Sequence, residues 1–115
     1  MMMKILKALT LVCLTLVCLT TFAQKPKWEK ANFQVWGNCE MCKTKIETAA
    51  KSVEGVKTAR WNVVNKKMKV KFNSAITNTD KIQQAIAIIG YDTEKHKAKD
   101  EVYNNLHHCC QYERE

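Results

Sequence analysis

The chain has 115 residues, of which 46% are hydrophobic and 26% are charged, and its formal net charge is +8. This length provides one domain and excludes Rossmann units and barrels, which need longer chains. With one proline and three glycines, the composition also excludes a low-complexity protein. The six cysteines are the unusual feature.

Residues 1–23 predict a cleaved secretory signal peptide. Lys4 and Lys7 flank the start of an apolar stretch that ends in small residues before polar Gln24. The stretch is shorter than the roughly 20 residues that span a membrane, so we expect no stable membrane insertion after cleavage. The predicted location is outside the cytoplasm, in the periplasm if the source is a Gram-negative bacterium.

Two alternatives for this segment stay open. It can be an uncleaved N-terminal anchor, or, with weaker support, a lipoprotein signal at Cys13 or Cys18, each of which follows a valine. After cleavage the chain keeps 92 residues, with 17 basic and 11 acidic side chains and a net charge of +6. The remaining cysteines form one C-x-x-C and one C-C pair: Cys39, Cys42, Cys109 and Cys110.

The hydrophobic pattern predicts an α+β domain over residues 31–98. Alternating apolar side chains indicate strands at 31–36, 56–63 and 67–72, and a weaker one at 91–98. Apolar residues three and four positions apart indicate helices at 41–53 and 80–89. The order β-α-β-β-α-β is that of a ferredoxin-like open antiparallel sheet with two helices on one face.

Basic residues alternate outward along the third predicted strand, at Lys67, Lys69 and Lys71. RNA-binding proteins of this topology carry aromatic side chains on the open sheet face, whereas Arg60 and these lysines occupy it here. We therefore expect no nucleic acid as partner. A charged face that docks an acidic protein surface, or keeps the sheet soluble, accounts better for the pattern.

Cys39 and Cys42 lie where the first predicted strand leads into the first helix. Cysteines at positions i and i+3 across a helix N-terminus place both sulfurs on one side, and the helix dipole stabilises thiolates there. Two thiolates suit copper(I) or mercury(II), and zinc(II) with further ligands. Met41, between them, points away from the two sulfurs and is expected to be exposed or to pack against its surroundings.

The C-x-x-C motif in this loop, with Gly90 and Tyr91 after the second helix, resembles the heavy-metal-associated domain family, which includes copper chaperones and periplasmic mercury-binding proteins. The resemblance covers about residues 32–98. It implies that Cys39 and Cys42 are the primary metal ligands and that Tyr91 lies beside their sulfurs. The alternative for Tyr91, a ring that covers the core at the start of an edge strand, stays open.

The chain departs from the family pattern just before the first cysteine. A methionine usually stands two residues before it, preceded by a glycine, whereas this sequence has Gly37 and Trp36 there. We therefore expect this loop to pack differently from its relatives, and the metal preference of those relatives does not transfer by resemblance alone.

The C-terminal tail, residues 99–115, lies beyond the family pattern. His107, His108, Cys109 and Cys110 concentrate soft metal ligands within four positions. They are candidates for auxiliary ligands that close over the metal at Cys39 and Cys42, or for a second metal site. The alternative is a mobile tail whose thiols form disulfides. His96 is expected to be a surface histidine.

No nucleophile–base pair, carboxylate pair or phosphate loop is visible, so we expect no enzyme. The predicted function is exported soft-metal binding, with copper(I) favoured, followed by transfer or sequestration of the ion. The predicted partner is a metal-transporting ATPase or another metal-handling protein with an acidic docking surface. The alternative function is a thiol–disulfide redox protein that uses the same two cysteines.

Overall fold

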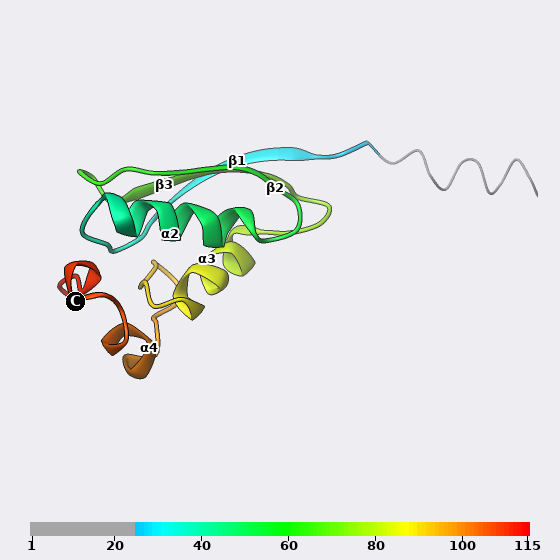
Figure 1. Cartoon of the computed structure of the whole chain (residues 1–115). Helices are drawn as coiled ribbons and strands as arrows, with labels where there is room; N and C mark the ends of the chain where they lie inside the picture. Colours follow the sequence, from blue (N-terminus) through cyan, green and yellow to red (C-terminus); the bar gives the residue numbers. More distant parts are fainter. Residues whose placement is uncertain (1–24) are drawn as a thin grey trace, which may run out of the picture.

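A computed structural model describes residues 25–115, so the predicted signal peptide lies outside the described residues. A three-stranded antiparallel sheet has the order β1-β3-β2 (Figure 1). Its strands are β1 (Trp28–Gln34), β2 (Val56–Trp61) and β3 (Lys67–Asn73). Helices α2 (Glu40–Lys51) and α3 (Thr79–Ile88) both lie on one face of this sheet (Figure 1). The predicted ferredoxin-like class, with two helices on one face, is confirmed as a βαββα arrangement.

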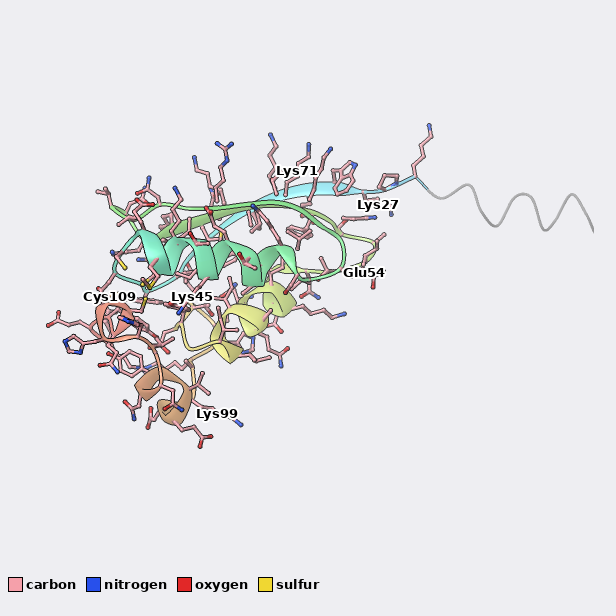
Figure 2. The ribbon with its side chains drawn as sticks, in the orientation of Figure 1. Lys27, Lys45, Glu54, Lys71, Lys99 and Cys109 are labelled. Carbon is pink, nitrogen blue, oxygen red and sulfur yellow. The ribbon has the colours of Figure 1, made fainter. Side chains whose placement is uncertain are left out.

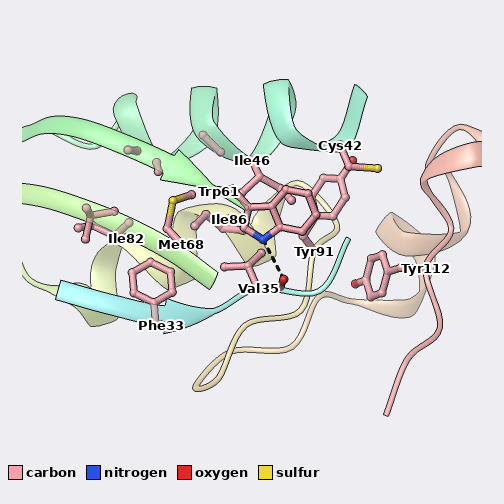
Figure 3. Packing of buried hydrophobic residues seen from close by; sticks show 14 of the residues in the cluster. Phe33, Val35, Cys42, Ile46, Trp61, Met68, Ile82, Ile86, Tyr91 and Tyr112 are labelled. Carbon is pink, nitrogen blue, oxygen red and sulfur yellow. Dashed lines mark hydrogen bonds between the residues drawn. The ribbon is translucent and has the colours of Figure 1, made fainter. Parts of the chain in front are cut away.

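The core lies between the sheet and the two helices. In β3, Met68, Val70 and Phe72 are buried, and in α2 the buried side chains follow the helical spacing of Cys42 and Ile46. The indole of Trp61 is fully buried and donates a hydrogen bond to the carbonyl oxygen of Val35 over 3.0 Å (Figure 3). This packing anchors the segment that leads from β1 to the first cysteine.

The predicted fourth strand at 91–98 does not form. A single bridge joins Val35 to Thr93, and the backbone N–H of Trp36 bonds to the carbonyl of Asp92. Beyond Thr93 the chain folds back, because the backbone N–H of Thr93 bonds to the carbonyl of His96 over 2.7 Å. The side chain of Asp92 then accepts the N–H of Ala98, so side-chain bonds replace a strand ladder.

The C-terminal segment is ordered and packs against the domain. It contains α4 (Asp100–Asn104) and a short 3-10 turn, η1 (His108–Cys110). It returns to the end of the molecule where α2 begins (Figure 1). The tail is therefore docked on the domain, and its buried residues include Cys110 and Tyr112. Within residues 25–115, no helix is long and apolar enough to cross a membrane.

Candidate metal centre

The loop Val35–Cys39 sets the position of the first cysteine. Gly37 lies so close to the core that a β-carbon there would stand 3.0 Å from both the Ile46 side chain and the ring of Trp61. The indole thus takes space next to the position where the related family usually carries a methionine.

Cys39 is the N-cap residue of α2, and Cys42 lies in its first turn. Their sulfur atoms are 3.5 Å apart. At N-caps an oxygen of Ser, Asp or Asn usually accepts a backbone N–H, but the Cys39 side chain makes no such bond. The N-terminal amides and the helix dipole therefore remain available to stabilise negative charge on the sulfurs.

A third sulfur reaches this pair from the C-terminal segment. The sulfur atoms of Cys39, Cys42 and Cys110 all lie within 4.8 Å of one another. Among residues 25–115, these are the side chains that come together as a potential metal-binding group of three. Cys42 and Cys110 are fully buried, Cys39 is half-buried, and all three are free thiols.

The other residues singled out in the tail lie outside this group. His107, His108 and Cys109 are exposed. The Cys109 sulfur lies 3.5 Å from Nδ1 of His107 and 3.9 Å from the sulfur of Met41, which is itself 47% exposed. Cys109 lies beside the start of α2 (Figure 2). The two adjacent cysteines thus differ in burial, with Cys110 buried and Cys109 exposed, although their sulfur atoms are 4.0 Å apart.

Tyr91 lies directly after Gly90, whose φ of +113° favours glycine at the end of α3. Its side chain is fully buried, and its hydroxyl has no hydrogen-bond partner among the described residues. Burial raises the pKa of Tyr91 far above its ordinary value, and the thiols of Cys110 and Cys42 add to the increase. The hydroxyl therefore stays protonated near the Cys42 and Cys110 thiols, and Figure 3 shows Tyr91 beside Cys42.

The C-terminal segment is held by residues that the sequence patterns did not single out. Arg114 donates from Nε and Nη2 to the two carboxylate oxygens of Asp92, at 3.0 and 2.9 Å. The hydroxyl of Tyr112 donates to the carbonyl of Gly90 at 2.9 Å and accepts the N–H of Asp92 at 2.8 Å. The available signal was the set of apolar residues beyond position 98, such as Leu106 and Tyr112, which need a surface to cover them.

His96, predicted to be a surface histidine, has a partly exposed side chain. Its Nε2 atom is 2.8 Å from a carboxylate oxygen of Asp80 in the first turn of α3. The pair ties the irregular 91–98 segment to that helix.

Comparisons with known proteins agree with this geometry. The heavy-metal-associated domain model matches residues 38–92. The chain is 36% identical over 66 residues to the copper chaperone CopZ of Enterococcus hirae, covering 56% of this chain and 96% of that protein.

Solved structures show the same arrangement. Oxidised MerP from Ralstonia metallidurans aligns with a TM-score of 0.56 and 26% identity, over 59% of this chain and 96% of that one. The Cu(I)-loaded N-terminal domain of a potential copper-translocating P-type ATPase from Bacillus subtilis aligns with a TM-score of 0.55 and 28% identity, over 58% and 85%. With this fold and nearly the whole length of CopZ matched, the chain belongs to the heavy-metal-associated domain family.

Proposed function

We propose that this protein binds a soft metal ion through the thiolates of Cys39 and Cys42 and then transfers or sequesters it. The observation that carries the proposal is the pair of sulfurs 3.5 Å apart at the N-terminus of α2. Neither sulfur is engaged in a disulfide. The helix end stabilises the thiolate form, which is the form that binds soft metals.

Copper(I) is the favoured ion. Thiolate pairs select soft metals, and relatives of this chain are named as a copper chaperone and a Cu(I)-loaded ATPase domain. Mercury(II) and zinc(II) suit the same donors, although zinc requires further ligands. The protein then acts as a carrier or store of the ion and not as an enzyme, and we expect the predicted signal peptide to direct it out of the cytoplasm.

The basic surface supports an acidic partner, namely a metal-transporting ATPase or another metal-handling protein. Lys30, Arg60, Lys69 and Lys71 line a shallow hollow of about 540 Å³ on the open sheet face. Side chains on this face point away from the helices, as Lys71 does in Figure 2.

A second hollow, of about 470 Å³, connects this face to the beginning of α2. Its basic lining residues are Lys43, Arg60, Lys67 and Lys69. Positive charge therefore extends from the open sheet face toward the cysteines, where it favours approach of an acidic metal-handling protein at low ionic strength.

The test is replacement of both cysteines. Cys39→Ser combined with Cys42→Ser should abolish tight Cu(I) binding in a competition assay with a chromophoric Cu(I) chelator, while circular dichroism shows an intact fold. Cys109→Ser is the matched control, because it removes one exposed thiol from the same end of the molecule and should retain binding. Wild-type Cu(I) affinity in the double variant would refute the proposal. Efficient turnover of the wild type in an insulin-reduction assay would instead favour the redox function.

A further inference from the structure

We propose that Cys110 is a third thiolate ligand, so that one soft ion is held between the loop before α2 and the C-terminal segment. This inference rests on the metal-binding function proposed above. It assigns a fixed role to one tail residue and gives the site three sulfurs where the C-x-x-C motif alone supplies two.

The distances suit three sulfurs around one ion. A metal–thiolate bond of about 2.3 Å places neighbouring sulfurs roughly 3.8–4 Å apart in tetrahedral or trigonal geometry. The Cys39 and Cys42 sulfurs are 3.5 Å apart, and Cys110 joins them within 4.8 Å. The Cys39–Cys42 separation is slightly shorter than required and no separation exceeds the required one by more than about 1 Å, so each sulfur needs to move by about half an ångström at most.

The position of Cys110 is built by its neighbours. Two residues further on, Tyr112 is 2% exposed and stacks on Tyr91 with a ring-centroid distance of 5.8 Å. The ring of Tyr103 contacts the ring of Tyr112 edge-on, with a centroid distance of 5.0 Å, and the Tyr103 hydroxyl donates to the backbone carbonyl of Tyr112. Aromatic packing of this kind fixes the backbone on one side of Cys110.

An ion pair fixes the segment further on. Arg114 is bidentate to Asp92 and also donates from Nη1 to Asp100 at 2.8 Å. The Asp92 side chain is 6% exposed and the Arg114 side chain 21% exposed, so solvent screens the pair little.

The residue before Cys110 is held as well. The backbone carbonyl of Cys109 accepts contacts from the Asn38 side chain at 3.5 Å and from the Cys39 thiol at 3.8 Å. The C-terminal segment is therefore tied directly to the loop that carries the first ligand.

The unpaired hydroxyl of Tyr91 is an independent indication of a ligand. A buried hydroxyl without a hydrogen-bond partner destabilises the folded state, and native proteins rarely retain one. This hydroxyl lies beside the Cys42 and Cys110 sulfurs, where a thiolate is a strong acceptor. Ionisation of the thiols on metal binding supplies the missing partner, because Tyr91 can then donate to one of the sulfurs.

The chemistry balances without an oxidant. Three thiols lose their protons to solvent and three metal–sulfur bonds form, while the oxidation state of the ion is unchanged. A third thiolate adds a bond that must break before the ion can leave. This favours retention of the ion until a partner displaces the C-terminal segment.

The experiment is X-ray absorption spectroscopy on the reduced protein loaded with one equivalent of Cu(I). We expect three sulfur neighbours of the ion in the wild type and two in Cys110→Ser. The Cu(I) affinity of this variant should fall by more than about tenfold, because losing a ligand should cost at least as much as losing a residue that hydrogen-bonds to a ligand. The matched control is Cys109→Ser, one position away and exposed, which should retain three sulfurs and wild-type affinity.

The outcomes separate the two proposals. Two sulfurs in the wild type, with Cys39 and Cys42 still required, would overturn the role of Cys110 and leave the metal-binding function standing. Tight Cu(I) binding that survives loss of both Cys39 and Cys42 would overturn the function itself. If Cys110→Ser fails to fold, the Cys109→Ser variant still decides the question: three sulfurs in that variant leave Cys110 as the third donor, and two sulfurs overturn its role.

Discussion

The two cysteine pairs of this protein behave differently because of their spacing. Cys39 and Cys42 are three positions apart at the start of a helix, and their sulfurs converge to 3.5 Å. Cys109 and Cys110 are adjacent in a 3-10 turn, where successive side chains point about 120° apart. Cys110 is fully buried beside the Cys39 and Cys42 thiols, whereas Cys109 is exposed.

In this protein the adjacent cysteines therefore bring one sulfur into the group of three thiols, whereas the i, i+3 pair brings two. The two pairs also differ in what holds the cysteines in position. The first pair is held by its own helix, whereas Cys110 depends on residues that follow it in the chain. Weakening the residues that hold the C-terminal segment should therefore expose the Cys110 thiol, as the Cys109 thiol is exposed already.

Arg114→Met should have the largest effect. The substitution leaves the carboxylate of Asp92 buried without its charged partner, which costs about 3 kcal/mol. The C-terminal segment should then open about a hundredfold more often, which corresponds to that free energy. Pulse labelling of the metal-free protein, with mass spectrometry to identify the modified thiol, would follow the exposure of Cys110.

Lys97→Met serves as the control for this experiment. Lys97 also contacts the C-terminal end, through a 3.0 Å hydrogen bond from Nζ to the carbonyl of Glu115, but this contact is exposed. Exposed contacts contribute little, so labelling of Cys110 should stay near the wild-type rate. If Arg114→Met labels Cys110 no faster than Lys97→Met, the ion pair does not hold the segment.

Tyr91→Phe should have opposite effects on the empty and the loaded protein. The substitution removes a buried hydroxyl that has no partner, so the free energy of unfolding of the metal-free form should stay the same or rise. The Cu(I) affinity should fall by about tenfold, because the hydrogen bond to a sulfur is lost. Urea unfolding and chelator competition measure the two effects, and an unchanged affinity would remove Tyr91 from the site.

Acid should produce the smallest effect, a loosening of the C-terminal segment in the metal-free protein. Burial alone would raise the pKa of Asp92, but the bonds from Arg114 and the Ala98 N–H hold it below its ordinary value of 3.8. Because its pKa is lowered in the folded protein, Asp92 contributes its full stabilisation above the ordinary value of 3.8. The contribution is lost as the pH falls through the lowered pKa.

The NMR signals of Tyr112 should report this acid transition. Asp92→Asn provides the control, since an amide does not titrate and the transition should disappear. A transition that persists unchanged in this variant would assign it to another carboxyl group.

Much of the fold could be predicted from the sequence because its signals are local and periodic. The alternation through Met68, Val70 and Phe72 and the helical spacing of Cys42 and Ile46 match the buried residues. The segment at 91–98 was predicted as a strand and is not one. Its alternation was weak, and side-chain bonds from Asp92 and Thr93, which no periodicity encodes, decide its path.

The candidate site could be predicted in part for the same reason. The spacing of Cys39 and Cys42 is a local pattern, so their convergence follows from helix geometry. The choice between Cys109 and Cys110, by contrast, depends on Arg114, Tyr112 and Asp92, which meet only when the chain has folded. A tertiary arrangement of this kind leaves no mark in the spacing of the cysteines themselves.

The contact between Gly37 and Trp61 has a consequence for exchanging parts between relatives. Because a β-carbon at position 37 would already stand 3.0 Å from both the indole and the Ile46 side chain, a larger side chain has room there only if these neighbours shift or become smaller. Positions 37 and 61 are 24 apart in the chain, yet the side chain that fits at one of them depends on the residue at the other. A chimaera with methionine at position 37 should therefore also need a smaller residue at a contacting position such as 61, since substitutions at contacting positions are not additive.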